Sequence, residues 1–153
     1  MLNPDFRDML SAFDAEGVEF LIVGAYALAG HGLPRATGDL DVWIRRSSEN
    51  AARVMRALIA FGAPTEQITE ANLCARDLVF QMGIEPSRID ILTSIDGVEF
   101  DGAWSNRLLA SVDGLAVPIL GLEDLIRNKR TMGRDQDLAD VARLQAEVHR
   151  RKQ

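Results

Sequence analysis

The segment that most restricts the fold is Asp39–Ile44, with the sequence DLDVWI. Two carboxylates separated by one leucine lead directly into Val-Trp-Ile, a run that favours a buried β-strand. Side chains alternate along a strand, so the leucine, valine and isoleucine share one face and can pack on a core. Asp39 and Asp41 then share the other face, about 6 to 7 Å apart along the strand. Two anions facing the same way raise each other's pKa unless a cation binds between them. The segment therefore predicts a strand that places a cation, or a functional site, on its second face.

A third carboxylate lies in the segment 87–94, SRIDILTS, where Asp90 stands between Ile89 and Ile91. The isoleucines predict a core-facing side, which leaves Asp90 on the opposite face. If this strand neighbours the first one, Asp90 joins Asp39 and Asp41. Hard ions such as Mg²⁺ or Mn²⁺ prefer oxygen ligands, and three carboxylates can hold two ions that stabilise the attacking and leaving oxygens of phosphoryl-type transfer. Asp90 is then also the candidate base for a hydroxyl proton. The alternative is a surface Asp-x-Asp pair and an edge-strand aspartate that faces solvent.

The remaining pattern alternates helices with strands and predicts an α/β or α+β domain with a mixed sheet flanked by helices. We expect one domain over residues 1–153, with an α/β core over about 1–120 and C-terminal helices over 121–153. Apolar stripes are expected at Val54, Met55, Leu58 and Ile59 and at Leu138, Val141 and Leu144. Helices are expected over about 4–16, two turns within 25–32, 48–61, 121–132 and 135–151. Strands are expected over 18–23, 39–44, the hairpin 77–83 with 87–94, and a weak or edge strand within 112–119.

Composition limits the environment and the partners. No apolar run approaches the roughly 18 residues of a membrane span, and the N-terminal residues do not read as a secretory signal. Cys74 is the only cysteine, so we expect no intrachain disulfide and a cytoplasmic location. The formal charge of −6 argues against general nucleic-acid coating. Five arginines within 34–56 leave a local basic surface open, although a solvated face is the plainer interpretation.

A turn of small residues follows the first predicted strand. The run 18–23 ends at Gly24-Ala25, where a short helix is expected to begin. Backbone N–H groups at such a turn bind phosphate well, and glycine lets a ligand approach closely. The turn is neither a Walker A loop nor a G-x-G-x-x-G fingerprint. By itself it is a weak indication of a phosphate site.

The segment 20–44, FLIVGAYALAGHGLPRATGDLDVWI, resembles the signature of the polymerase-β-type nucleotidyltransferases. In those enzymes a strand ends in a small-residue turn, a short helix follows, and Asp-x-Asp comes on the next strand. The Arg35-x-Thr37-x-Asp39 approach is similar to the minimal, abortive-infection-toxin (AbiEii-like) branch. The segment 125–144 also resembles that branch, with Lys129, Asp137 and Asp140 at its lysine and aspartate positions.

The resemblance implies a nucleotidyltransferase fold and metal-dependent transfer of a nucleoside monophosphate from an NTP such as ATP, with release of pyrophosphate. Asp39, Asp41 and Asp90 would hold Mg²⁺ or Mn²⁺ and carry the catalysis. The nucleotide would be bound by five residues with different expected parts. The Gly24 and Ala25 amides would cradle the triphosphate, Lys129 and Arg35 would neutralise it, and Thr37 would fix the loop before the carboxylates.

The acceptor stays open between RNA or tRNA, a protein and a small molecule. The branch also implies a toxin–antitoxin setting with a cognate protein partner. The lack of a long apolar run predicts no membrane partner. A catalytically weak nucleotidyltransferase-like interaction module of such a pair is the main alternative. Metal-dependent glycosyltransferases also use Asp-x-Asp, but they need a longer chain and lack this glycine turn.

Overall fold

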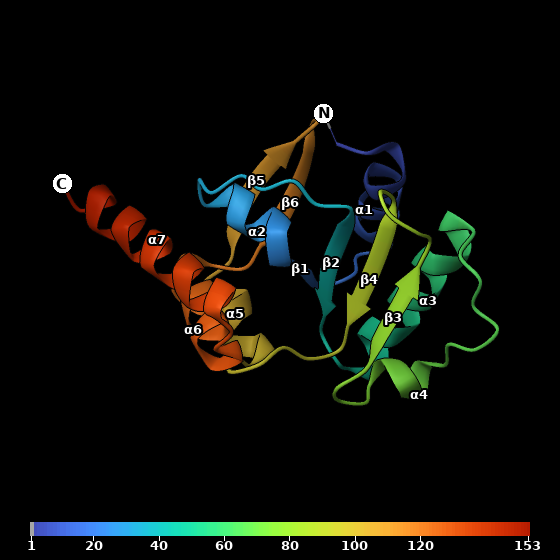
Figure 1. The fold of residues 1–153 in the computed structure, drawn as a ribbon. Helices are drawn as coiled ribbons and strands as arrows, with labels where there is room; N and C mark the ends of the chain where they lie inside the picture. Colours follow the sequence, from blue (N-terminus) through green and yellow to red (C-terminus); the bar gives the residue numbers. More distant parts are fainter. Residues whose placement is uncertain (1) are drawn as a thin grey trace.

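The computed structural model describes residues 2–153 and shows a six-stranded mixed sheet with helices on both faces (Figure 1). The strand order is β3-β4-β2-β1-β6-β5. The strands are β1 (Phe20–Val23), β2 (Asp39–Ile44), β3 (Val79–Met82), β4 (Arg88–Leu92), β5 (Leu108–Val112) and β6 (Leu115–Ile119). The helices are α1 (Pro4–Ala15), α2 (Gly24–Gly30), α3 (Ser48–Phe61), α4 (Glu70–Leu73), α5 (Phe100–Ser105), α6 (Leu122–Met132) and α7 (Asp135–Arg151).

Strand β2 lies inside the sheet, antiparallel to β1 and parallel to β4. The predicted hairpin is present, because β3 runs antiparallel to β4. The mixed α/β architecture expected from the sequence is confirmed. Helices α1 and α3 begin at polar caps, where the Asn3 and Ser47 side chains accept backbone N–H bonds from Asp5 and Asn50.

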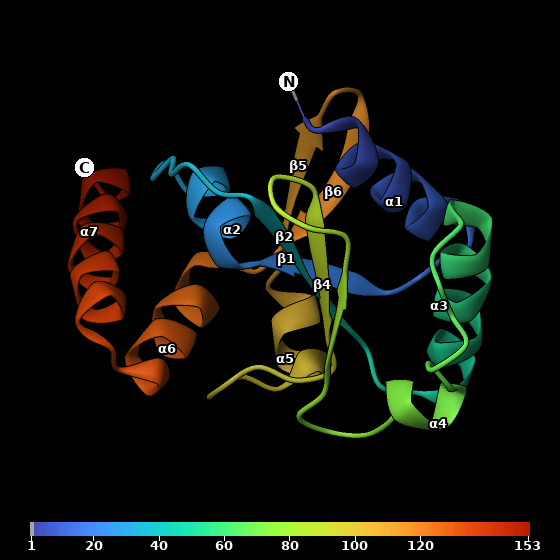
Figure 2. The same ribbon diagram turned by 45° about the vertical axis from the view of Figure 1, so that its right-hand side comes forward.

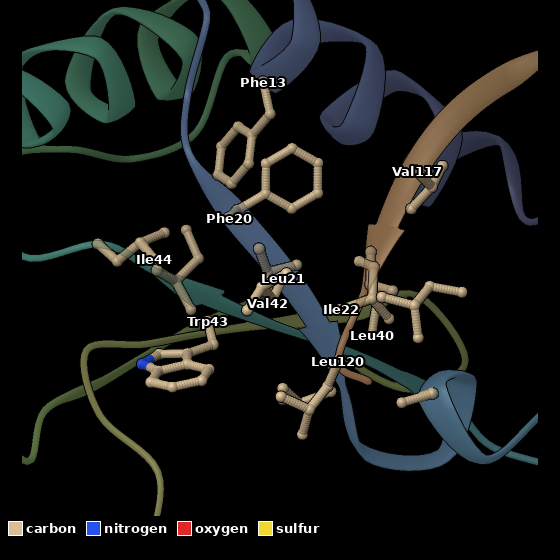
Figure 3. Packing of buried hydrophobic residues seen from close by; sticks show 14 of the residues in the cluster. Phe13, Phe20, Leu21, Ile22, Leu40, Val42, Trp43, Ile44, Val117 and Leu120 are labelled. Atoms are coloured by element: carbon tan, nitrogen blue, oxygen red, sulfur yellow. The ribbon is translucent and has the colours of Figure 1, made fainter. Parts of the chain in front are cut away.

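The main apolar core lies between the sheet and the pair α1 and α3. Leu40, Val42 and Ile44 of β2 are all buried there, as the alternation predicts. Figure 3 shows these side chains around β1 and β2, with Phe13 of α1 edge-on to Phe20 at 5.3 Å between ring centroids. Burial on this face fixes the register, because a one-residue slip would turn the carboxylates inward.

The opposite face of the sheet carries the aspartates and is only partly covered. Helix α2 lies against β1 and β2, and α6 packs with α7 beside it (Figures 1 and 2). Trp43 is buried on this face against Phe100 of α5, with 5.0 Å between ring centroids. In Figure 1, α1 and α3 lie behind β3 and β4, α4 lies below the end of β3, and none of the described helices covers the front of these strands. The sheet therefore has one closed face and one face open at the β3 edge.

Three expectations about this fold are wrong. The segment 112–119 is not one edge strand, because Asp113 and Gly114 adopt positive φ angles and turn β5 into β6. Strand β6 then lies inside the sheet, and β5 forms the edge. Ile59 and Leu138 do not face the core and are 63% and 50% exposed. Each stands at the margin of its apolar stripe, and at least half of its surface stays in contact with solvent.

No helix within residues 2–153 is both long and apolar enough to cross a membrane.

Candidate active site

The site is built on two neighbouring parallel strands. The register of β2 and β4 sets Asp41 directly beside Asp90 and Asp39 beside Arg88. One carboxylate oxygen from each of Asp39, Asp41 and Asp90 lies within 4.8 Å of the others. Asp90 is only 7% exposed, because β4 is an interior strand covered by β3 on its other side. The structure thus brings together the three carboxylates that the strand patterns placed on one face.

Two side chains hold Asp39 from opposite ends of its carboxylate. The Thr37 hydroxyl donates to Oδ1 at 2.8 Å, and Arg88 Nη2 donates to Oδ2 at 2.9 Å. Arg88 Nε also lies 3.2 Å from Asp90 Oδ1. Arg88 therefore supplies a cation beside the cluster. It lies two residues before Asp90 on the same strand face, as the alternation of side chains predicts.

Asp41 is the member of the cluster whose negative charge is least favourable. Burial, followed by the charges of Asp39 and Asp90, raises the pKa of Asp41 to about 7. Asp90 Oδ1 is buried and, among residues 2–153, accepts no hydrogen bond of good geometry, its nearby cation being Arg88 Nε at 3.2 Å. An arrangement of close carboxylate oxygens with unsatisfied acceptor capacity fits a hard divalent cation such as Mg²⁺.

The glycine turn packs directly on this cluster. Val23, the last residue of β1, pairs with Asp41, and Gly24 follows with a φ of +68°. A Cβ atom at Gly24 would lie 2.2 Å from Asp41 Oδ2. Only glycine combines this backbone conformation with so close an approach to the carboxylate.

A cavity of about 380 Å³ opens beside the turn. The cavity is lined by Gly24, Ala25, Asp41 and Lys129, four of the residues that the sequence predicts to bind nucleotide or metal. The other lining residues are Val23, Leu92, Ser94, Ile95, Asp96, Asn128, Met132 and Arg134. Most of these residues come from the segment after β4 and from α6. Long-range packing brings both near the glycine turn, so no local sequence pattern predicts that these residues line the cavity.

Lys129 and Arg35 belong to a buried charge network between α6, α7 and the loop before β2. Lys129 Nζ lies 3.5 Å from Asp137 Oδ1 and 3.2 Å from Asp140 Oδ2. Arg35 Nη1 donates to the same Asp140 carboxylate at 3.0 Å. Burial alone would raise the pKa of Asp140, but hydrogen bonds from Arg35 and Lys129 outweigh it and lower that pKa to about 2. Lys129 still borders the cavity, whereas Arg35 is bound to α7 and is not among the residues that line it.

Comparison with known proteins gives a match at the level of structure. No protein-family profile and no curated protein matches the sequence. A proposed nucleotidyltransferase from Thermotoga maritima, TM1012, has a TM-score of 0.61 at 16% identity, with 96% of each chain covered. The antibiotic-resistance factor ANT(2'')-Ia has a TM-score of 0.57 at 15% identity, over 97% of this chain and 91% of that one.

A second structure of ANT(2'')-Ia, in complex with adenylyl-2''-tobramycin, has a TM-score of 0.51 at 13% identity, over 94% of this chain and 96% of that one. Identities this low establish the shared fold and nothing finer. The mixed sheet with its flanking helices is the nucleotidyltransferase fold.

Proposed function

We propose that the protein transfers a nucleoside monophosphate from an NTP to an acceptor hydroxyl and releases pyrophosphate. The observation that carries this proposal is the convergence of Asp39, Asp41 and Asp90 beside the Gly24 turn, within a nucleotidyltransferase fold. The third carboxylate is the important part, because an Asp-x-Asp pair alone is common in turns and on surfaces.

The three aspartates would hold Mg²⁺ or Mn²⁺, since they present only oxygen donors close enough to share an ion. When bound, such an ion supplies positive charge to the reacting phosphate. Thr37 and Arg88 fix the orientation of the Asp39 carboxylate through hydrogen bonds to its two oxygens. Partners of this kind commonly orient the ligands of a metal site.

The cavity beside the glycine turn is the proposed nucleotide site. Its volume of about 380 Å³ falls within the usual range for small-molecule sites. The Gly24 and Ala25 amides would donate to the triphosphate, and Lys129 would add a positive charge. Ala25 has no hydroxyl, so at that position only the backbone can contribute. Arg35 would act on this site indirectly, by holding Asp140 and with it Lys129.

The reaction needs a base for the acceptor. We propose that Asp90 accepts the hydroxyl proton while the acceptor oxygen bonds to the α-phosphorus. The bond from that phosphorus to the pyrophosphate oxygen breaks, and pyrophosphate leaves with the bonding electron pair. Charge and atoms balance without a further reactant.

The biological setting follows the sequence resemblance. The Arg35-x-Thr37-x-Asp39 approach and Lys129, Asp137 and Asp140 support the AbiEii-like branch, and with it a cytoplasmic toxin–antitoxin role with a cognate protein partner. All three carboxylates are present, so an active enzyme is favoured over an interaction module that has lost catalysis.

The test is transfer of radioactive label. The protein is incubated with each α-³²P-labelled NTP, Mg²⁺ and a cell extract, and label bound to any extract component is measured. Wild-type protein should transfer label and release pyrophosphate, and Asp39→Asn should do neither. The matched control is Asp8→Asn, an exposed aspartate on α1. If the folded wild-type protein transfers no label from any of the four NTPs, the proposed nucleotidyl transfer is wrong.

A further inference from the structure

We propose that Arg88 is a built-in counter-ion that prevents the three aspartates from holding a divalent ion tightly on their own, so that the ion binds tightly only together with the nucleotide. This inference rests on the proposed nucleotidyl transfer and deepens it, because it gives Arg88 a part in the coupling between metal binding and nucleotide binding.

Arg88 is shared between two of the three carboxylates. Its Nη2 donates to Asp39 Oδ2 at 2.9 Å and to Asp90 Oδ2 at 3.4 Å, and its Nε lies 3.2 Å from Asp90 Oδ1. The parallel register of β2 and β4 pairs Arg88 with Asp39, and Asp90 stands two residues further along β4 on the same face. One guanidinium group therefore contacts carboxylate oxygens from both strands on which the proposed metal site is built.

The ion pairs of the cluster all belong to this arginine. Among the ion pairs within residues 2–153, those that include Asp39 or Asp90 are made by Arg88, and Asp41 takes part in none. Lys129, the cation on the cavity side, is bound to two aspartates of α7. The three carboxylates and the one guanidinium group together carry a formal charge of −2.

A guanidinium group in this position opposes a divalent ion in two ways. It takes up lone pairs of Asp39 and Asp90 that the ion would use as ligands, and its positive charge repels the ion from a few ångströms away. Mg²⁺ gives up its water ligands reluctantly and is usually held by one or two carboxylates together with substrate phosphates. The cluster alone is therefore a weak metal site, and the phosphate oxygens of the nucleotide supply the ligands and the charge that it lacks.

This coupling acts in both directions. If the nucleotide raises the affinity for the metal ion, the metal ion must raise the affinity for the nucleotide by the same factor. The folded protein would thus leave most of its sites without an ion until an NTP arrives, and Arg88 would compensate the charges of Asp39 and Asp90 in the meantime.

A purely structural role of Arg88 predicts the opposite effect on metal binding. If Arg88 only orients Asp39 and Asp90 as ligands, its removal would misplace both carboxylates and weaken the binding of the ion. If Arg88 is a counter-ion, its removal makes the cluster more negative and frees ligand oxygens, so the ion should bind more tightly. The direction of the change in affinity distinguishes the two roles.

The experiment measures Mn²⁺ binding to the full chain without nucleotide, from the electron paramagnetic resonance signal of the free ion. Arg88→Gln should bind Mn²⁺ at least about tenfold more tightly than the wild type, the order of magnitude for removing one unit charge a few ångströms from the ion. Arg88→Lys keeps the charge and should stay close to the wild type. Arg56→Gln, which removes an ion-paired arginine on α3, is the matched control and should leave the Mn²⁺ affinity unchanged.

Two results would overturn the inference: an Arg88→Gln variant that binds Mn²⁺ no more tightly than the wild type, or an Arg88→Lys variant that gains as much affinity as Arg88→Gln. The melting temperature of each variant in excess Mn²⁺ shows whether it is folded. If Arg88→Gln does not fold, the wild type decides, because a Kd for Mn²⁺ alone below about 10 µM, as in dedicated metal sites, contradicts the inference and weaker binding supports it.

Failure of the proposed function gives a different result. In that case α,β-methylene ATP, a probe that cannot transfer its nucleotidyl group, would not bind to the wild type in calorimetry with Mn²⁺, and the coupling to the nucleotide would fall with it. The comparison of Mn²⁺ affinities between Arg88→Gln and the wild type contains no nucleotide, so it tests the counter-ion independently.

Discussion

At the scale of single residues, Asp41 links the stability of the protein to its proposed chemistry. Its pKa rises from an ordinary 3.8 to about 7 in the folded state. The folded protein therefore binds more protons than the unfolded chain between about pH 4 and 7, so the contribution of Asp41 to stability falls as the pH rises through that window. The charged form is unfavourable until a cation compensates it.

Asp41→Asn should consequently stabilise the protein against urea at pH 8 in chelator, by on the order of 1 to 3 kcal/mol, and change little at pH 4. The substitution removes a buried anion next to two others. Urea unfolding of both proteins across pH 4 to 8 measures the difference. A variant less stable than wild type at pH 8 would show that the Asp41 charge is structural.

The second prediction at this scale concerns the effect of a side chain at Gly24 on stability and NTP binding. Gly24→Ala introduces a Cβ atom 2.2 Å from Asp41 Oδ2 at a φ of +68°, so it should cost about 2 to 4 kcal/mol and abolish NTP binding. Gly62→Ala is the matched control, because Gly62 has a φ of +89° and the added Cβ would have no atom of residues 2–153 within 4 Å. It should lose only about 1 kcal/mol and bind NTP normally. Equal losses in the two variants would mean that the contact with Asp41 can relax.

At the scale of elements, the ion pairs of Asp140 join α7 to α6 and to the loop before β2. Asp140 is fully buried between Lys129 and Arg35. Because its pKa is lowered to about 2, its stabilising contribution is complete above about pH 4 and is lost as the pH falls toward 2.

Asp140→Asn should destabilise the protein by on the order of 2 to 3 kcal/mol at pH 7, because the buried Lys129 loses one of its two carboxylate partners and the partly exposed Arg35 loses Asp140. Between pH 4 and pH 2, the free energy of unfolding should fall less in the Asp140→Asn variant than in the wild type. Asp135→Asn, at an exposed position in the first turn of α7, should cost under about 1 kcal/mol through the helix dipole. Urea unfolding at several pH values compares the three proteins. A loss for Asp140→Asn no larger than that of the control would contradict the network.

The elements that the sequence predicted best are those with one clear periodicity. Strand β2, the β3–β4 hairpin and helices α1, α3, α6 and α7 each combine an apolar stripe or alternation with a definite cap or turn. Strand β5 is an exposed edge, and α5 contains Gly102, so neither has a strong pattern. Asp113-Gly114 was a usable signal for the β5–β6 hairpin, because this dipeptide favours type I′ turns.

At the scale of the whole molecule, the site joins residues that are far apart along the chain. The sequence places Asp90 on the face opposite Ile89 and Ile91, but only the sheet order sets β4 beside β2. The contribution of Arg88 follows from the same strand. Arg35 and Lys129 meet their carboxylate partners only because α7 packs beside them. The packing of α6 and α7 also brings Asn128 and Arg134 to the cavity. These relations come from long-range packing, which local patterns do not contain.

We propose that the three carboxylates, the glycine turn and the cavity together bind an NTP with a divalent ion. Calorimetry of ATP and the other NTPs with the wild-type protein, in Mg²⁺ and then in excess chelator, tests it most directly. Saturable binding in Mg²⁺ that disappears in chelator, and that Asp41→Asn abolishes while the protein stays folded, is the predicted result. Equal NTP affinity with and without the metal ion would contradict the three-aspartate site.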